Sequence, residues 1–550
     1  MNETLLPGLL VGIPILGATL PLAIGLLRDR VGWLLATLVL ALEAVVATAL
    51  AYFVYVDGQR IVHVLGGETF GRGEAIETAD GETAEGFVLG IELVGDALSA
   101  LFVLLVGLVA LAVLAFSRRD GPRGNAFYSG YLLLTGGLMG VALTGDLFNL
   151  FVFLEIVGLA TYALVASGRG GESAVAALKY LIIGTAGASL YLVGVGYLYV
   201  RTGALNMVDV SRSLAGEPAW IAEEFGGSLY GDPLVIAAFG FIAVGLATKA
   251  ALFPLHTWQP DAYAESPDSV TIYISALVST LSAYALARIT WQVFTPEFFA
   301  AANNELALNM LLGLAALSVL VGSALAAMQL RVKRMFAYSS VAQFGLIVLA
   351  IGLAVHPEAS ETATRLAVYG AVIHLLAHAI IKSGLFATAG ALRAGTGARL
   401  VSEYAGLAKK RPSLSGAMAV LGFGIIGVPP SIGFIGKWYI AVGAVETGLW
   451  AVVFVVFAST LLTLLYVARI LEKLYFDYLP EDAPDHAEPS ATPRALTDGG
   501  RTLSVGMLAV VGLATVFSIA LGFGGSELTS AIEPIADAVL ENAPEVGGDD

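Results

Sequence analysis

Long apolar runs constrain this chain more than any other feature. They extend over about 18–28 residues between short polar segments, and about 20 apolar residues are enough to cross a bilayer as a helix. The chain is 57% hydrophobic and 13% charged, whereas soluble proteins carry about 25% charged residues. Barrel strands would alternate in polarity over about ten residues, and the sequence shows no such alternation. We therefore expect an all-α polytopic membrane protein, with 1–550 forming a single membrane domain.

About fourteen transmembrane helices are expected, with boundaries good to about 2–4 residues. They are predicted at 5–26, 32–56, 88–116, 126–145, 147–167, 174–200, 233–253, 268–290, 306–328, 335–355, 363–392, 415–442, 448–474 and 503–525.

Basic residues gather in the loops that follow odd-numbered spans. Because short loops rich in Lys and Arg stay in the cytoplasm, we expect a multi-pass protein of the cell membrane with both termini outside. The basic residues concerned are Arg28, Arg30, Arg118, Arg119, Arg123, Arg169, Arg331, Lys333, Arg334, Arg393, Arg399, Lys409, Lys410 and Arg411.

The chain has no cysteine and a net charge of −16. Without thiolates it cannot hold Cys-ligated iron–sulfur clusters or zinc, and we expect no cofactor. Nothing in it resembles a basic nucleic-acid-binding patch. An acidic, lysine-poor exterior fits a halophilic host, because high salt screens repulsion between carboxylates. An ordinary acidic outer surface is the alternative.

Ionisable side chains nevertheless interrupt several apolar runs, namely Glu155, Lys179, Lys249, Lys382 and Lys437. A charge at the centre of a membrane helix costs about 2.5–3.5 kcal/mol on insertion scales, so such residues pair, face internal water and mark ion or proton paths. Glu155 and Lys179 lie on consecutive spans joined by a short turn. Their axial offset of about 7 Å or less, at 1.5 Å per residue, makes an ion pair feasible. An isolated structural ion pair is the alternative for any one residue.

His374, His378 and Lys382 are spaced i, i+4, i+8 and share one face of an apolar helix. Imidazoles beside a lysine favour a proton relay. Structural, hydrogen-bonded histidines are an alternative, and a metal site is a weaker one. A zincin helix would carry glutamate directly after the first histidine, where this chain has Leu375.

Prolines interrupt two of the lysine-bearing spans. Pro254 follows Lys249 in the seventh span, and Pro429 and Pro430 precede Lys437 in the twelfth. Broken helices in membranes line cavities, and a pair of them in the two halves of a chain points to an inverted-repeat transporter.

These residues lie in motifs that resemble the antiporter-like subunits shared by respiratory complex I, membrane-bound hydrogenases and Mrp-type cation/proton antiporters. The matching stretches are 145–155, 178–186, 248–267, 333–343, 374–386 and 433–438.

The resemblance implies two inverted five-helix repeats, 126–290 (helices 4–8) and 306–474 (helices 9–13). Helices 1–3 (1–125) and helix 14 (503–525) flank them. It also implies that protons cross a hydrated central axis through Glu155, Lys249 and Lys437, with Lys179, His374, His378 and Lys382 along it. With a lysine at position 437, this chain is similar to Mrp D-type or hydrogenase-type subunits.

One position departs from the family. Related chains carry a lysine or histidine in the eighth span, where this chain has Thr280 before Tyr284 and Arg288. A hydroxyl bridges water but holds no proton in the physiological range, so His256 or water would have to fill the gap.

The expected function is the proton-translocating subunit of a multisubunit Mrp-type Na⁺/H⁺ antiporter, with other membrane subunits as partners. One alternative is a proton-pumping subunit of a complex I-like NADH:quinone oxidoreductase or hydrogenase. Another is a non-transporting assembly subunit.

Overall fold

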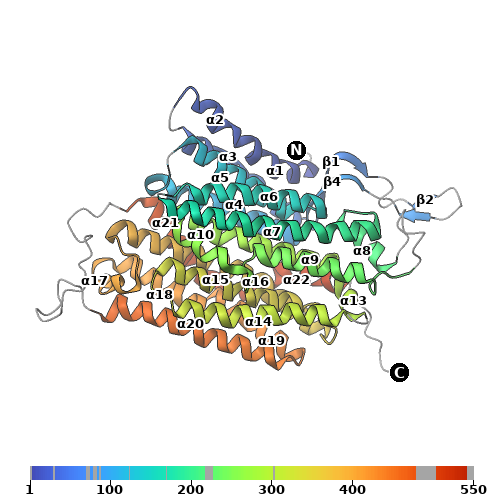
Figure 1. The fold of residues 1–550 in the computed structure, drawn as a ribbon. Coiled ribbons are helices and arrows are strands. Elements are labelled where there is room, and N and C mark those ends of the chain that lie inside the picture. Colours follow the sequence, from blue (N-terminus) through green and yellow to red (C-terminus); the bar gives the residue numbers. More distant parts are fainter. Residues whose placement is uncertain are drawn as a thin grey trace, which may run out of the picture.

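The computed structural model describes residues 3–28, 31–69, 75–77, 83–85, 88–122, 124–168, 170–216, 227–301, 304–477 and 503–541. Its long helices lie side by side in one bundle, with α2 and α3 at one flank and α20 at the other (Figure 1).

The N-terminal elements are η1 (Glu3–Leu5), α1 (Leu6–Gly17), α2 (Thr19–Gly25), α3 (Gly32–Tyr55), β1 (Ile61–Thr69), β2 (Ala75–Glu77), β3 (Thr83–Glu85), β4 (Val88–Gly95) and α4 (Ala97–Asp120). The central elements are α5 (Asn125–Leu143), α6 (Leu147–Ala166), α7 (Gly171–Thr202), α8 (Met207–Ala215), α9 (Pro233–Lys249), η3 (Leu255–Trp258), α10 (Gln259–Glu265), α11 (Asp268–Tyr273), η4 (Ile274–Val278), α12 (Ser279–Gln292) and α13 (Thr295–Ala300). The C-terminal elements are α14 (Glu305–Ala327), α15 (Val332–Leu353), α16 (Glu361–Thr396), η5 (Val401–Tyr404), α17 (Leu407–Lys410), α18 (Pro412–Ile426), α19 (Ile432–Glu446), α20 (Trp450–Phe476), α21 (Val505–Phe523) and α22 (Gly525–Leu540).

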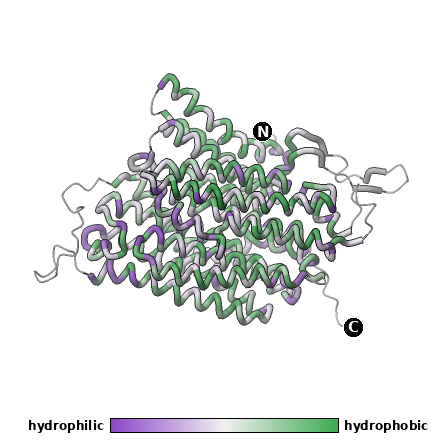
Figure 2. Tube along the Cα trace, in the orientation of Figure 1, coloured by the Kyte–Doolittle hydropathy of each residue, from purple (hydrophilic) through white to green (hydrophobic). Residues whose placement is uncertain are grey.

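The predicted helical membrane fold is confirmed. In the described residues, 12 helices are long and apolar enough to cross a membrane, and α9 and α18 are shorter apolar helices. Apolar residues dominate the long helices (Figure 2). The two shorter helices end shortly before the prolines at which their spans were predicted to be broken, Pro254 and Pro429–Pro430. The total of fourteen spans stays a prediction.

A small β structure lies between α3 and α4, where the sequence pattern did not predict it. β1 pairs antiparallel with β4, from Ile61 opposite Gly95 to Thr69 opposite Val88, and β2 pairs with β3. The apolar run predicted as a helix from residue 88 is therefore a strand up to Gly95. The helix begins later because Asp96 caps it: its Oδ1 accepts the Ser99 backbone N–H at 2.8 Å.

Loops after α4, α6, α14 and α16 meet at one end of the bundle around a cavity of about 490 Å³. Its walls include Gly121, Gly168, Arg331, Arg393 and Arg399. The meeting of these loops agrees with the prediction that they share one side. Which side faces the cytoplasm stays a prediction. Arg30, Arg123, Arg169, most of the 475–502 connection and 542–550 lie outside the described residues.

Candidate functional site

Lys249 is the last residue of α9 and lies inside the bundle. The helix ends there because the chain turns at Ala251, whose φ of 60° is left-handed. The lysine side chain is 6% exposed, and its Nζ donates a hydrogen bond to Glu155 Oε1 at 3.0 Å. Glu155 comes from the middle of α6, so the pair joins the broken helix to its neighbour. A cation and a carboxylate in contact balance each other's charge inside the membrane.

Lys179 does not pair with Glu155, which corrects the feasible pair inferred from sequence. Its Nζ lies 2.7 Å from Asp261 Oδ2, and Arg334 Nη1 lies 2.6 Å from Asp261 Oδ1. Axial spacing placed the two residues at similar heights but did not determine which faces of their helices meet. The next residue on α7, Tyr180, contacts Tyr162 of α6 edge-on with ring centroids 4.7 Å apart. Lys179, rotated by about 100° around the helix, turns towards α10.

Three predicted residues of α16 line up in the interior. His378 Nδ1 lies 3.4 Å from Thr280 Oγ1 on α12, and His374 Nε2 lies 2.9 Å from Gln343 Oε1 on α15. Lys382 is fully buried, and its Nζ donates to the Phe336 carbonyl at 2.8 Å. The predicted stripe is therefore a continuous face of polar side chains.

Lys437 of α19 is held by the broken end of α18. Its Nζ donates to the carbonyls of Ile425 and Ile426 at 3.1 and 2.9 Å. These carbonyls lack helical partners because the chain leaves the helix at Gly427, whose φ is 90°. In the described part of the chain, Lys382 and Lys437 donate to carbonyl and hydroxyl oxygens and not to a carboxylate. Backbone dipoles take the place of a counter-charge.

A small cavity lies between the histidines of α16 and the broken end of α18. Its volume is about 10 Å³, and Gln343, His374, His378 and Ile425 contribute to its walls. That is close to the space one water molecule needs. The site thus has room for about one water between imidazoles and the carbonyls that hold Lys437.

His256 lies in η3 and packs between the rings of Phe253 and Tyr338, with centroids 5.5 and 5.8 Å away. Its Nδ1 has no hydrogen-bond partner among the described residues. The group that lies against Thr280 is His378 of α16, and the suggestion that His256 or water fills the gap in the eighth span stays a prediction.

Sequence reasoning missed several partners of the buried charges. Asp261 lies in the polar segment that follows the seventh span. An acidic residue next to a helix break was the signal that could have identified it. Gln343 and Ser339 lie on α15, and Lys382 contacts Ser339. Nothing local in the sequence shows that α15 faces α16. In the described residues, no group of three or more His, Asp and Glu could hold a metal ion.

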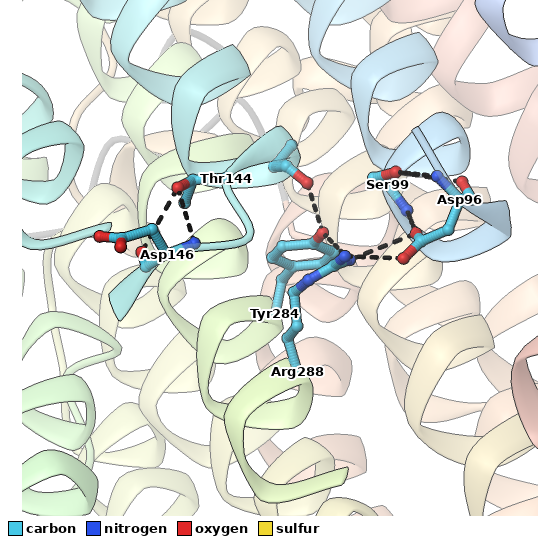
Figure 3. Close-up of polar contacts among 7 residues, drawn as sticks. Asp96, Ser99, Thr144, Asp146, Tyr284 and Arg288 are labelled. Carbon is cyan, nitrogen blue, oxygen red and sulfur yellow. Dashed lines mark hydrogen bonds and ion pairs between the residues drawn. The ribbon is translucent and has the colours of Figure 1, made fainter. Parts of the chain in front are cut away.

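A second buried ion pair ties the eighth span to the N-terminal helices (Figure 3). Arg288 of α12 donates to both Asp96 carboxylate oxygens, at 3.2 and 2.6 Å. It also donates to the Tyr284 hydroxyl at 2.9 Å, and that hydroxyl donates to the Ala142 carbonyl at 2.5 Å. Tyr284 and Arg288 thereby connect α12 with α4 and α5. This network holds the segment that presents Thr280 to His378.

We expect Arg288→Gln to lower the thermal melting temperature of the purified protein. The Arg288 side chain is 4% exposed, and removing one partner of a buried pair costs about 3–5 kcal/mol because the other charge stays buried. Lys473→Gln is the control, since Lys473 pairs with Asp477 on the surface and exposed pairs contribute about 0–1 kcal/mol. Equal melting temperatures for the two variants would contradict a structural role for Arg288.

Comparisons with known proteins agree with this geometry. The family described as NADH:quinone oxidoreductase/Mrp antiporter, transmembrane, matches residues 144–463. The N-type subunit of NADH-quinone oxidoreductase from Desulforudis audaxviator is 46% identical over 397 residues, covering 71% of this chain and 74% of that protein. The D-type subunit of the Na⁺/H⁺ antiporter from Bacillus subtilis is 29% identical over 456 residues, covering 82% and 84%. A chain of the Mrp complex from a Dietzia species superposes with a TM-score of 0.80 at 26% identity, covering 98% of this chain and all of that one.

Proposed function

Because the chain belongs to the NADH:quinone oxidoreductase/Mrp antiporter transmembrane family, we propose that it is the proton-translocating subunit of a multisubunit Mrp-type Na⁺/H⁺ antiporter in the cell membrane. The buried row formed by Lys249, the α16 stripe and Lys437 carries this proposal. Other membrane subunits of the complex are its partners. In this proposal 126–290 and 306–474 are the two inverted repeats, and the termini face outward.

The lysines of the row suit proton transfer because of how they are held. Lys382 and Lys437 are bonded to neutral carbonyl and hydroxyl groups, so either can lose its proton without leaving a buried carboxylate unpaired. A lysine amine can hold or release a proton in this way, whereas an arginine stays charged. His374 and His378 lie between them along α16 and can accept or pass a proton.

Glu155 is the proposed switch of the row. Its side chain is 23% exposed while that of Lys249 is 6% exposed, so it faces the more accessible side of the pair. When Lys249 transfers its proton to the next group, Glu155 loses its counter-charge. The negative charge of Glu155 then favours uptake of the next proton. Lys179, 38% exposed and bound to Asp261, lies nearer the surface, where protons would reach this pair.

A redox-driven proton pump is the second candidate, and the 46% identity to an NADH-quinone oxidoreductase subunit favours it. Electron transfer would then take place in partner subunits, because this chain has no cysteine to hold a cluster. The assembly-subunit alternative is weakened by His378, which provides an imidazole beside Thr280.

The complete gene cluster, expressed in a host without its own Na⁺/H⁺ antiporters, separates these functions. Inverted membrane vesicles are first acidified by respiration. An antiporter releases the proton gradient when Na⁺ is added, and omission of this chain abolishes the release. A redox pump instead acidifies the vesicles with NADH and quinone and does not respond to Na⁺, which would contradict the antiporter assignment. Normal Na⁺ exchange by a complex lacking only this chain would contradict proton translocation by it.

A further inference from the structure

Glu43 is a buried carboxyl that the lysine–histidine row does not use. It lies near the middle of α3, is 0% exposed, and neither of its carboxyl oxygens has a hydrogen-bond partner among the described residues. A carboxylate at such a depth without a partner is costly, and intramembrane acids normally pair or face water. A neutral carboxyl avoids most of that cost.

No described cation is close enough to balance a charge on Glu43. α1 and α2 carry no ionisable residue. Arg118 of α4 lies over Trp33, ten positions along α3 and hence about 15 Å away. At the other end of α3, Tyr55 contacts Ala97 beside Asp96, about 18 Å from Glu43 along the axis.

The ionisable and polar groups that approach from α5 and α11 are hydroxyls. Gly107 of α4 lies against both Ala44, the residue after Glu43, and Met139 of α5, so Glu43 lies near the level of Thr135, one helical turn from Met139, and of the Tyr273 hydroxyl. That hydroxyl lies 2.7 Å from Thr135 Oγ1, which itself donates to the Tyr131 carbonyl at 3.0 Å. The Tyr273 proton is therefore directed at Thr135, and Tyr273 has no proton left to donate to a carboxylate. A neutral carboxyl suits surroundings that offer no donor to a carboxylate, and Glu43 forms no hydrogen bond with Tyr273 in the described residues.

Tyr273 also occupies a special place in the backbone. It is the last residue of α11, and the π-helical turn η4 follows directly. π-turns inside helices occur frequently at functional sites. The same span continues into α12, which carries Thr280 against His378. A change of charge at Glu43 would thus act on the segment that completes the central row.

We propose that Glu43 is a proton-binding site outside the central row, and that its proton is sensed by Tyr273 at the start of η4. The bound species is a proton rather than a metal ion, because hard metal cations take about six oxygen ligands and no group of three or more His, Asp and Glu in the described residues could hold one. The proposal does not depend on which ion the complex exchanges.

Infrared spectroscopy of the purified complex tests this without a transport assay. At neutral pH an exposed glutamate, with a pKa of about 4.3, is ionised. We expect the wild-type minus Glu43→Gln spectrum to contain the carbonyl band of a protonated carboxylic acid, shifted in heavy water. Glu43→Gln imitates the neutral acid, so its melting temperature should equal that of the wild type. A carboxylate band in the difference spectrum, or no acid band, overturns the proposal.

Two further variants test the link to Tyr273. Tyr273→Phe removes the hydroxyl and should shift the acid band of Glu43. Tyr131→Phe is the matched control, because Tyr131 stacks on Tyr273 with centroids 4.5 Å apart but directs its own hydroxyl to the Ala110 carbonyl. An acid band that does not move in Tyr273→Phe, or that moves equally in both variants, overturns the link.

Discussion

Replacing Lys249 should stop proton translocation by the assembled complex. Lys249→Ala removes the cation that contacts Glu155, and we expect Na⁺-dependent proton exchange in inverted vesicles to fall by about 100-fold or more, the usual size of losing a proton-transfer group. Lys249→Arg should fail equally, because arginine keeps its charge but does not release a proton.

The arginine variant makes this prediction specific. A lysine that merely balanced Glu155 would be replaced by arginine with activity retained, and that result would contradict the role of Lys249 as a proton carrier. Lys409→Ala is the control, since Lys409 is an exposed lysine of α17 and its loss should leave exchange unchanged at equal amounts of complex.

Glu155→Gln should be strongly destabilising. It leaves Lys249 buried without its counter-charge, which costs about 3–5 kcal/mol in the free energy of unfolding. We expect Lys249→Met to restore most of that loss when combined with Glu155→Gln, because the double variant buries no charge at this place. Unfolding of the purified protein, followed by heat or denaturant, measures both effects.

Lys179 provides the comparison for this pair. Its ammonium contacts Asp261 and not Glu155, so Lys179→Met and Glu155→Gln should add to within about 0.3–0.5 kcal/mol, as independent sites do. Additive effects for Glu155 and Lys249, with strong coupling between Glu155 and Lys179, would show that Glu155 pairs with Lys179 instead.

The main features of the fold follow from local chemistry in the sequence. Apolar runs long enough to cross a membrane predict the helices, and Pro254 and Pro429–Pro430 predict where two of them break. The strand at 88–95 was not predicted because a short apolar run followed by a longer one is indistinguishable from a single span. The capping residue Asp96, followed three positions later by Ser99, was the signal that separates the two.

The contacts within the site are harder to predict from the sequence than the fold, because they depend on which helix faces meet. The α16 spacing correctly places His374, His378 and Lys382 on one face. The partners Gln343 and Thr280 come from helices that are far away in the chain. Neighbouring residues of α7 point about 100° apart, and this angle decides that Lys179 contacts Asp261. No spacing along the chain predicts this contact.

The central claim is that one path connects the two broken helices, so that Lys437 is as necessary as Lys249. Proton flux into liposomes containing the whole purified complex, driven by a Na⁺ gradient, tests this directly with Lys437→Ala. We predict that the variant, present in wild-type amount, carries no Na⁺-driven proton flux although Lys249 and Glu155 are intact. Wild-type flux through Lys437→Ala would contradict a path that crosses the second broken helix.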